Sequence, residues 1–268
     1  LMLFGAAAQF GIFFTFAMAA LLGFDIRDAA SIAVIGAADG PTSIFVANFL
    51  NSQYLGPIIV AAYSYMALVP IVQPPVIRAL TTKHERRIRM GYTGTKVSKR
   101  TKILFPIFVT ILTGIVSPRA VALIGFLMFG NLLRECGVLD ALSETAQKVL
   151  ANLITLLLGI TVASKMTADA FLNWQTLMIL GLGLVAFIFD TVGGVLFAKL
   201  LNLFCKNKIN PMIGAAGISA FPMSARVVHK MGLAEDNQNF LLMHAVGVNV
   251  SGQIASVIAG GMILGFFG

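Results

Sequence analysis

The sequence predicts an all-α polytopic membrane protein, an inverted-repeat helical bundle in which two broken, re-entrant segments meet near the membrane midplane. Of its 268 residues, 58% are hydrophobic and 11% are charged, and the mean hydropathy is +0.90. Ordinary soluble domains contain about 25% charged residues. This composition therefore excludes a typical soluble enzyme, a disordered chain and a secreted disulfide scaffold.

Several apolar runs are long enough to cross a hydrocarbon core, which takes about 20 helical residues. The runs that we expect to span the membrane are 1–24, 54–80, 146–163, 174–204 and 239–267. Two shorter runs, 103–116 and 120–133, are joined by Pro118-Arg119. These two either cross the membrane where it is thin or form a hairpin.

Two further apolar segments are interrupted by glycine and proline. Segment 31–50 contains Gly-Ala-Ala-Asp-Gly-Pro-Thr, and segment 210–228 contains Gly-Ala-Ala-Gly-Ile-Ser-Ala-Phe-Pro. Irregular backbone at membrane depth is tolerated only inside protein or beside a water-filled cavity. Each arm of about ten residues is roughly 15 Å long as a helix, so we expect each segment to reach the midplane and return.

The distribution of basic residues sets the expected orientation. Nine of the 19 Lys and Arg residues lie in 78–102, which we place in the cytoplasm. The two span–break–span units then have opposite orientation, and paired breaks of this kind indicate an ion or substrate site. A nucleic-acid partner is not expected, because Tyr92 is the one Phe, Trp or Tyr of this stretch, so stacking aromatic residues do not alternate with the basic ones. The chain thus divides into a first repeat (1–80), a basic loop (81–102), connecting spans (103–173) and a second, inverted repeat (174–268).

Asp39 is the first candidate site residue. It lies in the first break, and segment 31–50 contains no Lys or Arg to pair with it. A charge at membrane depth costs at least a few kcal/mol, so we expect Asp39 to bind a cation or a proton. The alternative is a carboxylate that caps a half-helix. Thr42 either adds a hydroxyl to the site or, as we favour, caps the second half-helix.

The second break and the last span contain amide and hydroxyl oxygens that suit a hard monovalent cation. These belong to Asn210, Ser219, Asn249 and Ser251. Each has a structural alternative. Asn210 precedes Pro211, a common helix N-cap arrangement, Ser219 can be a small packing residue, and the last two can bond between helices.

Other polar side chains in apolar surroundings are also candidates. Tyr63 and Tyr65 lie in span 54–80, either at the interface or inside, where a phenol can hydrogen-bond an ion or relay a proton. Arg226 at the end of the second break is either a cytoplasmic anchor or a carboxylate binder. Asp190 and His244 are ionisable groups within apolar runs, and such groups are functional candidates by default.

Several kinds of site are not indicated. Cys136 and Cys205 have no second Cys or His at ligand spacing, so neither a disulfide nor a metal pair is expected. The sequence contains no Walker A, GxSxG, HExxH or CxxC motif. ATP hydrolysis, serine hydrolysis and zinc chemistry are therefore unsupported.

Two motifs carry a family resemblance. The stretches 36–42 and 210–226, together with 244–253, resemble the beta subunit of the sodium-pumping, biotin-dependent decarboxylases, which serve oxaloacetate, methylmalonyl-CoA or glutaconyl-CoA complexes. The first motif departs slightly, with Ala37 where some members have glycine. Family members are longer at the N-terminus, so we expect this chain to correspond to roughly their last three-fifths.

The resemblance implies a subunit that decarboxylates carboxybiotin delivered by a soluble partner and couples this to outward sodium transport with proton consumption. It implies Asp39, Tyr65, Ser219 and Arg226 as catalytic residues. Arg226, Gly214 and Asn210 would contact carboxybiotin, which is presented and not covalently bound. Asp39, Asn210, Ser219 and Asn249 would bind sodium.

The implied partners are a biotin-carrying carboxyltransferase alpha subunit, a small membrane gamma subunit and the lipid bilayer of a bacterial or archaeal cytoplasmic membrane. Further copies of the chain are left open as partners. The rival hypothesis is a sodium/proton antiporter or a sodium-coupled organic-anion transporter, since these also need inverted repeats and a carboxylate at the midplane. The family motifs favour the decarboxylase subunit.

Overall fold

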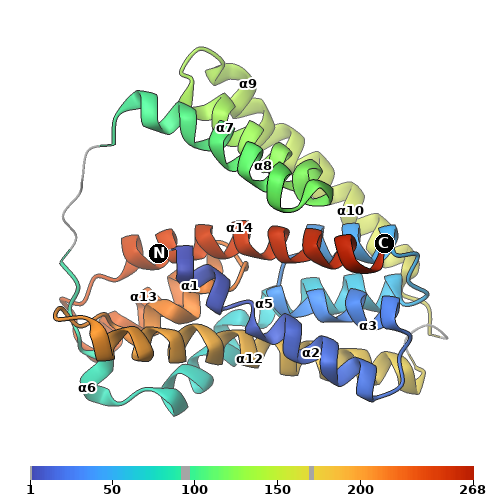
Figure 1. Ribbon diagram of the computed structural model, residues 1–268, viewed down its shortest axis with the longest axis horizontal. Helices are drawn as coiled ribbons and strands as arrows, with labels where there is room; N and C mark the ends of the chain where they lie inside the picture. Colours follow the sequence, from blue (N-terminus) through green and yellow to red (C-terminus); the bar gives the residue numbers. More distant parts are fainter. Residues whose placement is uncertain (1, 92–96, 169–171) are drawn as a thin grey trace.

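The computed structural model describes residues 2–91, 97–168 and 172–268, and in these ranges the regular secondary structure is entirely helical. Figure 1 shows two layers. The helices from both ends of the chain form one bundle. Helices α7 (Lys99–Val116), α8 (Val121–Glu135) and α9 (Asp140–Thr145) lie in a second layer beside α14 (Leu242–Phe267). The first and last parts of the chain therefore build a common core, and the middle of the chain packs outside it.

Five helical stretches are long and apolar enough to cross a membrane, which confirms a polytopic all-α membrane protein. They are Met2–Leu21, Leu55–Leu80, Asp140–Ser164, Trp174–Phe204 and Leu242–Phe267. The corresponding elements are α1 (Met2–Ala7) with α2 (Phe10–Leu21), α5 (Leu55–Leu80), α9 (Asp140–Thr145) with η3 (Ala146–Leu150) and α10 (Ala151–Lys165), α12 (Trp174–Phe204) and α14 (Leu242–Phe267). Helix α5 is continuous although it contains Pro70, Pro74 and Pro75, as neighbouring groups in a membrane bundle permit.

The first span has an interruption that the sequence analysis did not predict. Helix α1 ends at Ala7 and α2 begins at Phe10. Gln9 lies in this gap, and its Nε2 donates to the carbonyl oxygen of Gly5 (3.1 Å) and to that of Gly217 (3.4 Å). The predicted span over 1–24 is thus present as Met2–Leu21 but contains a break, and a polar side chain within it contacts the second broken segment.

The first predicted break is confirmed. Helix α3 (Ile26–Ala33) tightens into the 3-10 turn η1 (Val34–Ala37), and α4 (Gly40–Phe49) follows. Between them, Ala38 adopts the left-handed conformation with φ of 52°. A residue in the left-handed conformation ends a helical arm, because a right-handed helix cannot continue through it. The break leaves Asp39 at the start of α4.

The second predicted break is also present, but its first arm differs from the expected ten-residue helix. It is a seven-residue 3-10 turn, η4 (Pro211–Gly217), followed by non-helical residues before α13 (Met223–Glu235). Backbone packs directly on backbone here. An added Cβ at Gly214 would overlap the carbonyl oxygen of Gly194 in α12, and one at Gly252 in α14 would overlap that of Gly217. Small residues allow this close approach.

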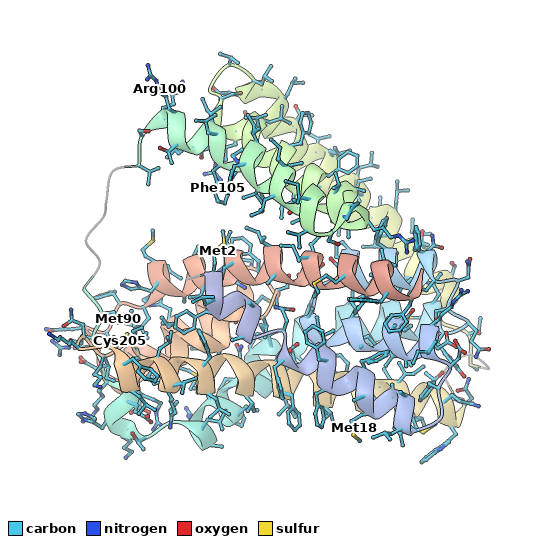
Figure 2. All side chains as sticks on the ribbon, in the orientation of Figure 1. Met2, Met18, Met90, Arg100, Phe105 and Cys205 are labelled. Atoms are coloured by element: carbon cyan, nitrogen blue, oxygen red, sulfur yellow. The ribbon has the colours of Figure 1, made fainter. Side chains whose placement is uncertain are left out.

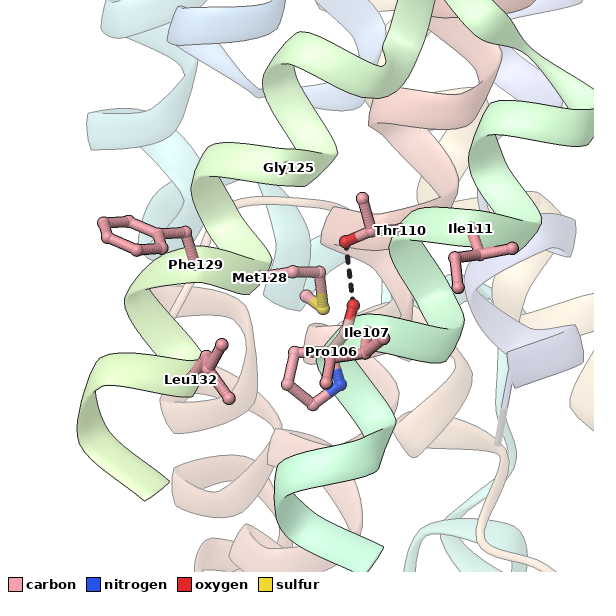
Figure 3. Close-up of a pocket in the computed structure, with 8 residues that line it drawn as sticks. All are labelled: Pro106, Ile107, Thr110, Ile111, Gly125, Met128, Phe129 and Leu132. Atoms are coloured by element: carbon pink, nitrogen blue, oxygen red, sulfur yellow. Dashed lines mark hydrogen bonds between the residues drawn. The ribbon is translucent and has the colours of Figure 1, made fainter. Parts of the chain in front are cut away.

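The two short runs form two packed helices joined by a short turn, an arrangement that both alternatives for these runs share. Helices α7 (Lys99–Val116) and α8 (Val121–Glu135) are joined by η2 (Pro118–Ala120). Large apolar side chains project outward from both helices, as Figure 2 shows for the region of Phe105. A mainly apolar groove runs between them, in which the hydroxyl of Thr110 bonds to the carbonyl of Pro106 (2.8 Å; Figure 3). None of the predicted site residues lines this groove.

Candidate functional site

Asp39 is the N-cap residue of α4. Its Oδ1 accepts a hydrogen bond from the backbone N–H of Thr42 (3.2 Å), so the capping alternative for this carboxylate is confirmed. The expectation that Thr42 itself caps the half-helix is wrong, because its N–H is the donor and Asp39 is the cap. The positive end of the helix dipole also favours a negative charge at this position.

The other oxygen of Asp39 meets two serine hydroxyls. Oδ2 lies 3.2 Å from Oγ of Ser219 and 2.8 Å from Oγ of Ser256, and the two hydroxyls are 3.1 Å apart. The three side chains come from the first break, the second break and α14. In addition, the N–H of Ser219 donates to the carbonyl of Ala37 (3.0 Å). The two broken segments therefore meet directly, and we name Asp39, Ser219 and Ser256 the central oxygen cluster.

The composition of the central oxygen cluster suits a monovalent cation. No described Lys, Arg or His lies within ion-pair distance of Asp39. Nor do three His, Cys, Asp or Glu side chains come together in the described ranges, as a divalent or transition-metal site usually requires. One half-buried carboxylate with two neutral hydroxyls can balance one positive charge, and it can exchange that cation for a proton.

Ser256 was not predicted from the sequence. The available signal was its spacing, since Ser256 follows Asn249 by seven residues and so lies on the same face of a helix. A single serine in a membrane helix is ordinarily a packing residue, which is why the spacing alone did not identify it.

We expect Ser256→Ala to lower the apparent sodium affinity about tenfold or more, the scale of losing a group that supports a metal ligand. The measurement is sodium-dependent thermal stabilisation of the purified protein. Ser251→Ala is the matched control, because the hydroxyl of Ser251 bonds to the carbonyl of Val248 one turn away in the same helix (2.6 Å). Equal sodium affinity in the Ser256 variant and the wild type would contradict this role.

Asn249 lies beside the central oxygen cluster. Its Nδ2 donates to the carbonyl of Ile218 (2.7 Å), the residue before Ser219, which is the inter-element bonding considered for it. Its Oδ1 is buried and has no hydrogen-bond partner among the described residues. The Nδ2 atom of Asn249 therefore stabilises the second break, and its Oδ1 atom can serve as a ligand.

Asn210 is used differently. Its Oδ1 accepts from the N–H of Met212 (3.1 Å), and its Nδ2 donates to the carbonyls of Arg86 and Ile88 (2.9 Å each). It is the N-cap of η4 and it ties this turn to the basic loop. The geometry thus favours the capping alternative, and no described contact brings Asn210 to the central oxygen cluster.

The two tyrosines of α5 have different surroundings. The hydroxyl of Tyr65 donates to the carbonyl of Leu180 in α12, and no described contact joins it to Asp39. The ring of Tyr63 packs so closely on Gly40 that an added Cβ there would overlap it. Since Gly40 follows Asp39 directly, Tyr63 is the tyrosine that the structure places next to the central oxygen cluster.

Gly214 lies within the second break, in η4, and Arg226 lies after it, at the start of α13. Gly214 lies directly against the backbone of Gly194, and its expected contact with carboxybiotin stays a prediction. Arg226 is exposed in the first turn of α13, and it forms no ion pair with a described acid. His244 lies in the first turn of α14 and is only half-buried. The guanidinium of Arg226 therefore remains available to an incoming anion.

The basic loop is anchored to the end of α13. The Nε of Arg86, which is 7% exposed, lies 2.6 Å from Oε1 of Glu235, and its carbonyl accepts from Nδ2 of both Asn210 and Asn239 (2.9 Å each). The hydrogen bond from Arg86 holds the pKa of Glu235 below its ordinary value of 4.5. The loop, the second break and α13 are thus joined at one place.

This ion pair predicts a pH effect on stability. Because the pKa of Glu235 is depressed in the folded state, its stabilising contribution is complete above about pH 4.5 and is lost as the pH falls through the lowered folded value. We expect Glu235→Gln to remove this part of the acid sensitivity and Glu235→Asp to restore some of it. Thermal unfolding between about pH 3 and pH 7 measures the difference. Identical pH profiles for wild type and Glu235→Gln would contradict it.

Comparison with known proteins identifies the family. The family described as "Na+-transporting oxaloacetate decarboxylase beta subunit" matches residues 1–267. This chain belongs to that family. It is 55% identical over 268 residues to the methylmalonyl-CoA decarboxylase subunit beta of Propionigenium modestum, covering all of this chain and 68% of the relative.

Two further relatives carry other substrate names. The chain is 54% identical over 269 residues to the oxaloacetate decarboxylase beta chain of Klebsiella pneumoniae, which covers 98% of this chain and 62% of that relative. It is 49% identical over 267 residues to the glutaconyl-CoA decarboxylase subunit beta of Acidaminococcus fermentans, covering all of this chain and 71% of the relative. The chain therefore spans about two thirds of the length of these family members.

Proposed function

We propose that this chain decarboxylates carboxybiotin delivered by a soluble biotin-carrying alpha subunit, and couples the reaction to outward sodium transport with consumption of a proton. The observation that carries the proposal is the central oxygen cluster, in which one carboxylate and two hydroxyls meet at the junction of two broken segments. Membership of the sodium-transporting decarboxylase family supplies the reaction.

Asp39 is the residue to which we assign cation exchange. With sodium bound, the ion's charge is balanced by the carboxylate, and Ser219 and Ser256 supply neutral oxygens. When sodium leaves, a proton takes its place on the carboxylate, so the buried charge is never left unbalanced. Because the two cations compete for one group, the affinity for sodium depends on the supply of protons, and this links the ion to the proton-consuming reaction.

Arg226 is the residue to which we assign the carboxyl group of carboxybiotin. A guanidinium binds a carboxylate through two parallel hydrogen bonds, and Arg226 is exposed with no described acid as a partner. Cleavage of the N–C bond releases CO2, and the nitrogen takes one proton to give biotin. The glycine-rich second break offers a water-poor surface against which the carboxylate loses solvation.

We place 1–80 and 174–268 as repeats of opposite orientation, with 81–102 on the cytoplasmic side of a bacterial or archaeal inner membrane. The meeting of the two breaks supports this arrangement, because paired interrupted segments of this kind build midplane sites. A small membrane gamma subunit completes the complex that we propose.

The test is reconstitution of the complete protein in vesicles with its biotinylated partner. We expect decarboxylation to require sodium, and sodium to accumulate inside inverted vesicles only while carboxybiotin is consumed. The alternative function, a sodium/proton antiporter, predicts sodium movement driven by a pH gradient in the absence of the biotin partner. Such movement without any sodium-dependent decarboxylation would overturn the proposal.

A further inference from the structure

Asp190 and Gln73 are buried polar side chains to which the proposed reaction assigns no role. Oδ1 of Asp190 accepts from the N–H of Gly11 (2.5 Å), so this side chain anchors the start of α2. Gln73 lies in α5 and has no exposed surface. Its Nε2 donates to the carbonyl of Ala215 in η4 (2.7 Å) and to the hydroxyl oxygen of Ser224 in α13 (3.1 Å). Gln73 therefore joins α5 to both η4 and α13.

The hydroxyl of Ser224 completes this arrangement. It also donates to the carbonyl of Ala215 (3.0 Å), and Ser224 and Ala215 have no exposed surface. We name Gln73, Ala215 and Ser224 the amide clamp. The nitrogen of Gln73 must face Ala215, because the reversed amide would bring its oxygen against a carbonyl oxygen, and both of these atoms are acceptors. The amide clamp therefore links the first turn of α13 to η4 with a defined direction.

The other half of the Gln73 amide is unused. Its Oε1 is buried and has no hydrogen-bond partner among the described residues, and an unpaired buried acceptor destabilises a fold. Without Gln73, the carbonyl of Ala215 would still have the hydroxyl of Ser224 as a donor. Satisfying this carbonyl is therefore not a sufficient reason for a buried glutamine, and what Gln73 adds is a fixed geometry at the start of α13.

The orientation of α13 decides where Arg226 projects. Ser224 precedes Arg226 by two residues, which is about 200° around a helix of about 3.6 residues per turn. Ser224 accordingly lies on the buried face and Arg226 on the exposed face. The buried face also packs through apolar side chains such as Val228 and Met231, and apolar packing is non-directional. The hydrogen bonds of the amide clamp prefer a narrow range of angles, so they limit rotation of the helix that carries Arg226.

We infer that Gln73 is a positioning residue, which holds the first turn of α13 so that Arg226 presents its guanidinium to the carboxyl group of carboxybiotin. The inference rests on the proposed function for the role of Arg226. Two parallel hydrogen bonds from a guanidinium to a carboxylate require a defined direction. The central oxygen cluster contains no residue of the amide clamp, so loss of the amide clamp weakens the use of carboxybiotin and leaves sodium binding unchanged.

The test is the kinetics of decarboxylation by the complete complex in vesicles, with the carboxylated biotin partner as the varied substrate. Gln73→Leu removes the donor and keeps a similar volume. We expect kcat/KM to fall about tenfold to a hundredfold, the upper value being the scale of a binding group misplaced by about 1 Å. We expect sodium-dependent thermal stabilisation of this variant to match the wild type. Ser224→Ala keeps the bond from Gln73 to Ala215, so we expect a smaller fall, and this variant provides the measurement if Gln73→Leu fails to fold.

The matched control is Ser31→Ala. Ser31 is also fully buried, but its hydroxyl donates to the carbonyl of Arg27 in its own helix, α3 (2.9 Å), so this bond lies within one segment. We expect Ser31→Ala to keep the kcat/KM of the wild type. A loss of sodium-dependent stabilisation in Gln73→Leu that parallels the fall in kcat/KM would show a general structural defect and would overturn the inference. An unchanged kcat/KM in folded Gln73→Leu would overturn it as well.

A second comparison tests the dependence on Arg226. Arg226→Lys keeps the charge but loses the guanidinium fork, so the direction of the side chain matters less. We expect Gln73→Leu to lower kcat/KM clearly less in the Arg226→Lys background than in the wild type, since the two residues act on one contact. Equal falls in both backgrounds would overturn the inference. An unchanged kcat/KM in Arg226→Leu would instead count against the proposed function.

Discussion

Asp39→Asn is expected to abolish sodium-dependent decarboxylation and sodium uptake, with a loss of at least about a hundredfold, the scale of removing an essential charge at an active site. Asparagine preserves the helix cap, because its side-chain oxygen can accept from the N–H of Thr42 as the carboxylate does. It cannot balance a cation or carry an exchangeable proton. The measurement is decarboxylation and sodium uptake in reconstituted vesicles.

The control for this prediction is another N-cap carboxylate. Asp25 caps α3, and its Oδ2 accepts from the N–H of Arg27 (3.0 Å) at an exposed position. Asp25→Asn makes the same chemical change at a helix of the same bundle. We expect full activity from Asp25→Asn and an unchanged melting temperature for both variants. Retention of sodium-coupled activity by Asp39→Asn would refute the role of Asp39 in ion exchange.

Gly214→Ala is expected to have the largest effect on folding. The added Cβ would overlap the carbonyl of Gly194, so the backbone of η4 and that of α12 would have to separate. Overpacking a well-packed interior commonly costs about 1–3 kcal/mol, and here no flexible side chain can move aside. We expect a clear fall in melting temperature, or loss of folded protein from detergent extracts.

Gly181→Ala supplies the comparison for this substitution. Gly181 lies in the same helix as Gly194, but a Cβ added there would meet nothing within 4 Å. Alanine also favours a helix over glycine, by about 1 kcal/mol. We therefore expect Gly181→Ala to be as stable as the wild type or slightly more so. Equal melting temperatures for Gly214→Ala and Gly181→Ala would contradict the close backbone packing.

The spans could be predicted because hydropathy and length determine which segments cross a membrane. Helices α5 and α12 begin and end within about one residue of the predicted runs 54–80 and 174–204. The two predicted breaks were visible because glycine and proline interrupt the apolar pattern. The break at Gln9 was not visible, since neither residue between α1 and α2 is glycine or proline. The side-chain nitrogen of Gln9 in this break donates to the carbonyl of Gly217, which is distant in sequence.

In the candidate site, too, some residues could be predicted from the local sequence and others could not. Asp39 could be predicted, because an unpaired charge in an apolar segment needs a partner wherever it lies. The capping role of Asn210 could not be predicted in full, because it involves the basic loop. The side-chain nitrogen of Asn210 donates to two carbonyls of that loop, those of Arg86 and Ile88. Ser256 became recognisable only when the fold brought α14 against both breaks. The roles of Asn210 and Ser256 depend on contacts between segments that are distant in sequence, and such contacts cannot be predicted from the local sequence.

The single main-chain hydrogen bond from Ser219 to Ala37 has a mechanical consequence. It joins the two broken segments beside the central oxygen cluster, while Asn210 joins the other end of η4 to the basic loop. A displacement of that loop, for example when a partner docks, is therefore transmitted through η4 to the residues around Asp39. The position of the basic loop and the geometry of the central oxygen cluster are therefore coupled through η4.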